Sequence, residues 1–224
     1  MADQLLTLPT YQERVNFYGA NGSGKSVLAA HMLSAGQYDY VAIDSKGDFS
    51  PPGEPVVIHS PEDPRWRRGF RHIVYRPDMG HNDGRALDEQ LMRLFARGKS
   101  SGRRHPFVVY VDEALYLSKT GRTRWLAALA VAGRSMGIGL WCSSQRPKWI
   151  PVEVRSEAWR QYVFFLGQEA DEEEILLTAK GAITLADLRS NTVDHAFLEL
   201  RRGHGGQVGV RRFPPLRIAE EAGA

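Results

Sequence analysis

Apolar and polar positions follow two different periodicities along this chain. Short apolar runs predict strands at residues 14–18, 39–43, 72–76, 107–111, 138–143 and 162–166. Apolar residues that recur every three or four positions predict helices at residues 24–35, 84–97, 122–136 and 171–179, with shorter ones near 153–160 and 184–189. Two late runs, near 195–200 and 207–211, predict an antiparallel hairpin. Strands that alternate with helices are typical of an α/β fold with a largely parallel central sheet flanked by helices.

Length and composition favour a single domain. The chain has 224 residues, 42% of them hydrophobic and 25% charged, and we expect a core over about 13–200 and a C-terminal hairpin and tail over about 195–224. The prolines and arginines of residues 47–71 indicate a long surface loop. No apolar run is long enough to span a membrane, and the N-terminus lacks the features of a signal peptide. Since Cys142 is the single cysteine, no internal disulfide can form, which fits a reducing cytoplasm. A net charge of +3 permits nucleic-acid binding without requiring it.

The strongest chemical signal follows the first predicted strand. Residues 19–26 fill every required position of the phosphate-loop pattern G-x-x-x-x-G-K-[ST]. Glycines let successive backbone N–H groups turn towards phosphates, and the following helix presents its N-terminus to the same groups. We expect Lys25 to contact the β- and γ-phosphates of ATP and the Ser26 hydroxyl to bind Mg²⁺. The predicted ATP-binding residues are Gly19, Ala20, Asn21, Gly22, Ser23, Gly24, Lys25, Ser26 and Val27.

Two acids, Asp112 and Glu113, directly follow the strand predicted at residues 107–111. In a parallel sheet the carboxyl ends of the strands line the ligand crevice, so Asp112 is predicted to hold Mg²⁺. Glu113 is predicted to polarise a water for attack on the γ-phosphate. Gln145 closely follows the strand predicted at residues 138–143. It would face the γ-phosphate as a sensor if that strand lies between the other two.

Other polar residues leave alternatives open. Asp44 follows a predicted buried strand and either braces Lys25 or the metal shell, or belongs to an ordinary turn. ATP hydrolysis at such sites often uses an arginine from a neighbouring subunit. Arg134 is the first candidate for that arginine; Arg146, Lys99 and Arg124 remain alternatives.

Together these motifs resemble those of one superfamily. Residues 19–26 match the Walker A motif and residues 112–113 the Walker B motif of the HerA/FtsK superfamily of DNA-pumping ATPases. Residues 43–48 are similar to its Asp-Pro-Lys-Gly element, with Ser45 in place of proline. The block from Gly133 to Pro147 is similar to its Gly-Arg…Gln-Arg-Pro block, the most specific of the signals. The resemblance covers roughly residues 13–175.

The resemblance implies a RecA-like P-loop fold of the additional-strand, catalytic-glutamate type. It also implies a homo-oligomeric ring, a hexamer or another small ring, with ATP at the subunit interfaces and double-stranded DNA in the pore. A chain with little beyond a motor core looks most like the viral ATPases that package a genome into a preformed capsid. A capsid or portal protein would then be a partner, and the protein would act in the host cytoplasm or at the packaging vertex of the virion.

Basic clusters offer a DNA path, although each can equally be solvated surface charge. The leading one is a predicted loop at residues 97–104, with Lys99, Arg103 and Arg104 as candidate DNA contacts. Three rival functions remain: a conjugative or filamentous-phage assembly ATPase, a small-molecule P-loop kinase, and a nucleotide-dependent scaffold without activity. Rivals of the first kind usually carry membrane segments. A kinase would be indifferent to DNA, and a scaffold would release no phosphate.

Overall fold

The computed structural model describes residues 5–60, 62–67, 71–77, 83–101, 105–114 and 124–216. The strands are β1 (Arg14–Tyr18), β2 (Tyr40–Asp44), β3 (Val56–Ile58), β4 (His72–Tyr75), β5 (Phe107–Asp112), β6 (Ile138–Ser144), β7 (Arg160–Val163), β8 (Phe197–Arg202) and β9 (Val208–Phe213). The helices are α1 (Lys25–Ala35), α2 (Asp83–Ser101), α4 (Arg124–Ala132), α5 (Val152–Ser156), α6 (Glu169–Ala179) and α7 (Leu185–Ser190). Short 3₁₀ turns lie at Pro64–Arg67, Gly133–Met136, Pro147–Trp149 and His204–Gly206.

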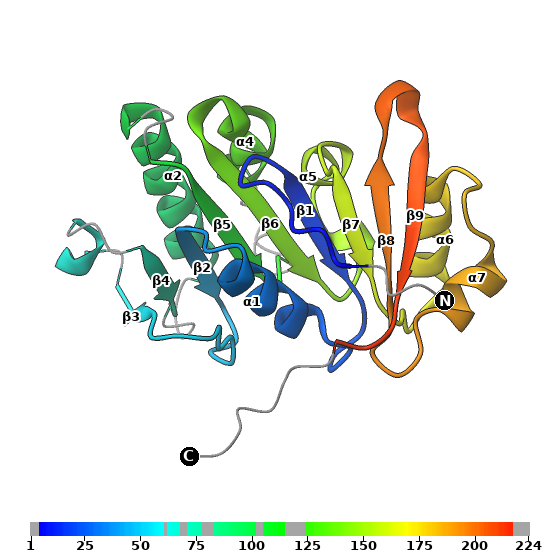
Figure 1. Ribbon diagram of the computed structural model, residues 1–224. Helices are drawn as coiled ribbons and strands as arrows, with labels where there is room; N and C mark the ends of the chain where they lie inside the picture. The colour runs from blue at the N-terminus through cyan, green and yellow to red at the C-terminus, as the bar shows by residue number, and fades with distance from the viewer. Residues whose placement is uncertain are drawn as a thin grey trace, which may run out of the picture.

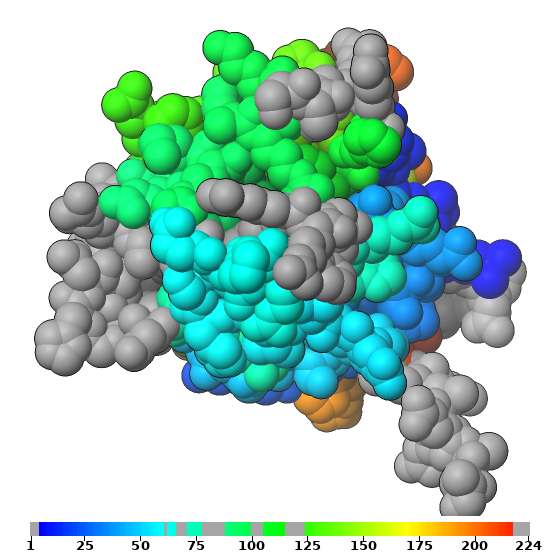
Figure 2. All heavy atoms as spheres, turned by 90° about the vertical axis from the view of Figure 1, so that its left-hand side faces the viewer, coloured from blue at the N-terminus to red at the C-terminus, as the bar shows by residue number. Residues whose placement is uncertain are grey.

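One sheet joins all the strands of the described residues, in the order β3-β4-β2-β5-β6-β1-β7-β8-β9 (Figure 1). The strands from β3 to β7 in this order pair in parallel, and β8 and β9 add an antiparallel hairpin at one edge. The predicted α/β fold with a largely parallel sheet is therefore confirmed. The segment around β3 and β4 covers the opposite edge, which faces the viewer in Figure 2.

Two apolar cores cover the two faces of the sheet because side chains along a strand alternate between them. Helix α1 packs Leu28, Met32 and Leu33 on one face, against strand residues such as Phe17 and Trp141. The helices α2, α4, α5, α6 and α7 contribute to the core on the other face. In Figure 1, α1 accordingly lies in front of the sheet and α2, α4 and α5 lie behind it. Both faces of the central strands are buried, which is why these strands read as continuous apolar runs.

Some element boundaries differ from the sequence-based predictions. The surface loop predicted at 47–71 contains β3, an edge strand that pairs with β4. The helix predicted near 153–160 ends at Ser156, and β7 begins at Arg160 rather than at Tyr162. Helix α2 continues to Ser101, so Lys99 lies in its last turn and not in a loop. Arg103 and Arg104 lie outside the described residues.

Candidate nucleotide site

The phosphate loop joins β1 to α1 at the carboxyl edge of the sheet. Gly24 caps α1 with φ of 103°, in the left-handed region that only glycine adopts at little cost. A Cβ on Gly19 would lie 2.7 Å from Cβ of Phe164, so the loop packs closely on the segment after β7. The Ala20 N–H donates to the carbonyl of Phe165 at 2.8 Å, which fixes the loop to that segment.

Lys25 and Ser26 open the helix and face the acids of β5. The Lys25 ammonium donates to the Ala20 carbonyl at 2.8 Å. Its side chain is buried, and burial lowers the pKa of Lys25 to about 8, although the nearby charge of Glu113 acts in the opposite direction. Ser26 Oγ donates to Asp112 Oδ1 at 3.1 Å. The predicted phosphate and metal residues are therefore brought together.

The two carboxylate oxygens of Asp112 differ, because one accepts several hydrogen bonds and the other accepts none from the described residues. Oδ1 accepts from Tyr110 at 2.8 Å and from Ser143 Oγ at 2.7 Å, besides Ser26. Oδ2 is buried and has no hydrogen-bond partner among the described residues. A buried carboxylate oxygen without a donor, beside a serine hydroxyl, fits a hard divalent cation such as Mg²⁺. Asp112 and Ser26 would hold the ion.

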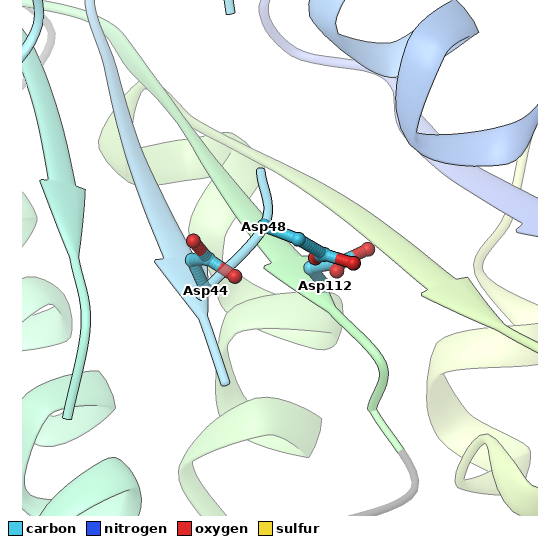
Figure 3. A group of neighbouring side chains, drawn as sticks. All are labelled: Asp44, Asp48 and Asp112. Carbon is cyan, nitrogen blue, oxygen red and sulfur yellow. The ribbon is translucent and has the colours of Figure 1, made fainter. Parts of the chain in front are cut away.

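Asp44, Asp48 and Asp112 each offer a carboxylate oxygen within 4.8 Å of the others (Figure 3). Asp48 is exposed and its carboxylate lies beside that of Asp112. Asp44 instead organises the turn that follows β2. Its oxygens accept from the N–H groups of Gly47 at 2.7 Å and Phe49 at 3.1 Å, and from Arg76 Nε at 2.8 Å. Of the two predictions for Asp44, these contacts favour the strand-end turn.

Glu113 follows Asp112 and turns towards different partners. Its backbone φ is 55°, an uncommon value outside glycine, and its side chain is buried. Strand β6 lies between β5 and β1, as the prediction for Gln145 required, and Gln145 Nε2 donates to Glu113 Oε2 at 3.0 Å. Ser143, which sequence reasoning missed, joins the two acids: its Oγ also accepts the Glu113 N–H at 3.2 Å.

The phosphate loop opens into a pocket of about 490 Å³. Lys46 and Asp48 line its phosphate end together with residues of the loop. Phe164, His195, Pro215 and Leu216 form the remaining wall, and sequence reasoning did not single them out for this role. They come from the segments after β7, before β8 and after β9, and no local motif marks them. The predicted Val27 lines the pocket as well.

The candidate arginines lie apart from this pocket. Arg134 is exposed and precedes β6, and its guanidinium lies 5.8 Å from the centre of the Trp159 ring. Because the residues of β6 separate it from the carboxyl edge by about 20 Å, Arg134 cannot contact the phosphate loop of its own chain. Arg146 is held within its own chain by Asp171, at 3.0 Å, and by the ring of Trp149. The exposed Lys99 also lies near the amino edge.

Comparison with known proteins finds likenesses to P-loop ATPases, in part of the sequence and in the fold. No protein-family profile matches the chain. The DNA double-strand break repair helicase HerA of Saccharolobus solfataricus is 31% identical over 102 residues, which are 44% of this chain and 20% of that protein. HerA of Sulfolobus acidocaldarius is 32% identical over 85 residues, 36% of this chain and 17% of that protein. The chain thus matches only about a fifth of the length of these curated relatives.

The structural likeness extends over nearly the whole chain. The genome packaging NTPase B204 of Sulfolobus turreted icosahedral virus 2, in complex with AMP, superposes with a TM-score of 0.70 at 20% identity, covering 92% of this chain and 98% of B204. EssC of Geobacillus thermodenitrificans superposes with a TM-score of 0.57 at 15% identity, covering 94% of this chain and 41% of EssC. The predicted resemblance to HerA/FtsK-type P-loop ATPases and the predicted fold class are confirmed.

Proposed function

We propose that this chain is an ATP-hydrolysing motor that translocates double-stranded DNA, and that its task is to package a viral genome into a preformed capsid. The observation that carries the proposal is the convergence of Lys25, Ser26, Asp112, Glu113 and Gln145 on one edge of the sheet. A buried glutamate beside the phosphate loop favours hydrolysis over binding alone, because it can take the proton of an attacking water. The HerA and B204 likenesses support an ATPase and the movement of DNA.

Each residue of the site has a different role in the proposed hydrolysis. The loop N–H groups and Lys25 bind the phosphates and neutralise charge that develops on the γ-phosphoryl group. Glu113 takes a proton from a water; the water oxygen bonds to the γ-phosphorus, and the bond from that phosphorus to the β–γ bridging oxygen breaks. ADP and inorganic phosphate are the products. Gln145 orients Glu113, to which it donates.

Mg²⁺ would be held by Ser26 and Asp112, whose partnerless Oδ2 is the available ligand. When bound, the ion supplies a Lewis acid that neutralises phosphate charge. Tyr110 and Ser143 keep Asp112 oriented by donating to its other oxygen. Burial and the charge of Asp112 raise the pKa of Tyr110, so its phenol stays protonated and remains a donor.

The wider assembly also belongs to the proposal. Arg134 lies at the edge opposite its own phosphate loop, so it would act on the nucleotide of a neighbouring subunit in a ring, six-membered by analogy with the superfamily. Double-stranded DNA would pass through that ring, with Lys99 as a candidate contact among the described residues. A capsid or portal protein would anchor the motor in the host cytoplasm or at the virion vertex. No helix among the described residues is long and apolar enough to cross a membrane.

Phosphate release with and without double-stranded DNA tests the motor. We expect DNA of arbitrary sequence to raise the ATP turnover several-fold, with a strong decrease in this effect as salt increases. Turnover that DNA leaves unchanged would favour a small-molecule kinase or another P-loop enzyme. Packaging itself is tested by adding procapsids of the source virus, which should protect DNA from nuclease only when ATP and the chain are both present.

Glu113→Gln tests the base. The amide keeps the size of the side chain but cannot accept the proton, so we expect nucleotide binding to persist while turnover falls by about 10²–10⁴. Glu54→Gln, at an exposed position in the segment between β2 and β3, is the matched control and should hydrolyse ATP like the native chain. Native turnover in Glu113→Gln would rule out this residue as the base.

A further inference from the structure

Lys46 bridges the tip of the phosphate loop and the base. It lies two residues beyond the end of β2, and its ammonium nitrogen is 3.1 Å from Glu113 Oε2. The same nitrogen is 3.5 Å from Asn21 Oδ1 in the phosphate loop. The Lys46 side chain is 28% exposed and lines the nucleotide pocket. The Lys46 ammonium therefore lies between the phosphate loop and the base.

The contacts of Lys46 restrain one half of the Glu113 carboxylate. Oε2 accepts from both Lys46 and Gln145, whereas Oε1 is buried and has no hydrogen-bond partner among the described residues. Burial by itself would lower the pKa of Lys46, but the hydrogen bond and charge of Glu113 outweigh it and the pKa is raised. Lys46 thus keeps its proton, and its ammonium occupies Oε2 together with the Gln145 amide.

We propose that Lys46 is a phosphate-responsive positioning residue, which holds Glu113 as seen here and moves to the γ-phosphate of a bound nucleoside triphosphate. The inference rests on the proposed function, because it concerns regulation of the same site. A phosphate loop places the γ-phosphate between its lysine and its tip, here between Lys25 and Asn21. The Lys46 ammonium already lies beside Asn21, so a short swing of its flexible stem reaches that position.

The exchange has a physical driving force. The γ-phosphate brings more negative charge than a carboxylate and more acceptor oxygens, so the ammonium gains by leaving Glu113. Glu113 Oε2 then loses one of its two partners while a substrate is bound, so the side chain is less restrained and can turn towards the attacking water. ADP lacks the γ-phosphate and leaves Lys46 on Glu113. A ligand shifts such an equilibrium only by its difference in affinity for the two arrangements, so ATP and ADP must differ in their dependence on Lys46.

Isothermal titration of the full chain with Mg²⁺ and either the ATP analogue AMPPCP or ADP tests this dependence. We expect Lys46→Met to weaken AMPPCP binding at least tenfold and to change ADP binding less than twofold. Lys46→Arg keeps the positive charge and should retain most of the preference for AMPPCP. Lys180→Met, whose native ammonium donates to the Gly206 carbonyl far from the loop, is the control and should bind both like the native chain.

A double-variant cycle with Glu113→Gln provides a second measurement. If Glu113 competes with the γ-phosphate for Lys46, removing the carboxylate charge strengthens AMPPCP binding more in the presence of Lys46 than in Lys46→Met. Equal gains in both backgrounds would overturn the exchange, as would equal losses of AMPPCP and ADP affinity in Lys46→Met. If the native chain binds neither nucleotide, the proposed function fails as well. If it hydrolyses ATP but Lys46→Met keeps the full preference for AMPPCP, only the role of Lys46 fails.

Discussion

Ser143 provides a quantitative test of how the two acids are held. Its hydroxyl donates to Asp112 Oδ1 at 2.7 Å and accepts the Glu113 N–H at 3.2 Å, whereas Tyr110 donates only to the same Asp112 oxygen, at 2.8 Å. Tyr110→Phe therefore subtracts one hydrogen bond to a charged group, which is worth about 1.5–3 kcal/mol. Ser143→Ala subtracts a similar bond and also leaves a buried N–H without a partner, which costs about 1–3 kcal/mol more.

Urea denaturation of the two variants measures these losses in the free energy of unfolding, and turnover at saturating ATP measures the effect on catalysis. We expect Ser143→Ala to be the less stable variant. We also expect it to be the slower enzyme, by about tenfold for each 1.4 kcal/mol by which the Glu113 backbone is less well held in the transition state. If Ser143→Ala and Tyr110→Phe have the same free energy of unfolding, the hydrogen bond from the Glu113 N–H to Ser143 does not contribute to stability, and the reasoning is wrong.

Two further predictions concern packing and assembly. A Cβ on Gly139 would lie 2.1 Å from the Tyr11 carbonyl oxygen, so Gly139→Ala should lower the free energy of unfolding by about 1–3 kcal/mol, measured in urea against Gly167→Ala, where a Cβ meets open space. Arg134→Ala should leave nucleotide binding by the dilute chain unchanged and lower turnover of the assembled protein by about 10³ or more. Loss of binding by the dilute chain would refute a role in a neighbouring subunit.

The acids and the phosphate loop could be predicted from the sequence because each follows a strand that is buried on both faces. Residues 107–111 and 138–142 read as unbroken apolar runs, and the polar residues after them must emerge at one edge of a parallel sheet. Strand β3 was missed because Pro51, Pro52 and Pro55 precede its short apolar run. Only the neighbouring strand β4 gives those residues a partner.

Other features depend on contacts between distant segments. The start of β7 was misplaced because Arg160 and Gln161 are polar, yet both are buried by partners that local sequence does not reveal. The Lys46–Glu113 pair needs the register that sets Asp44 opposite Asp112 in β2 and β5. The sequence does indicate that both residues closely follow strands of the predicted sheet. It does not indicate that these two strands are neighbours, which is what brings Lys46 and Glu113 together.

The order β2-β5-β6-β1 has a consequence for how this site can change. Lys46, the acids, Gln145 and the phosphate loop each follow a different one of these four hydrogen-bonded neighbours. Their spacing is therefore set by the hydrogen-bonded strands, which lie about 4.8 Å apart, and not by the side chains that perform the chemistry. Substitutions at these strand ends change the chemistry of the edge and leave the side chains of the apolar layers below it in place. A scaffold of this kind can acquire a different substrate or a different trigger by a few substitutions at one edge.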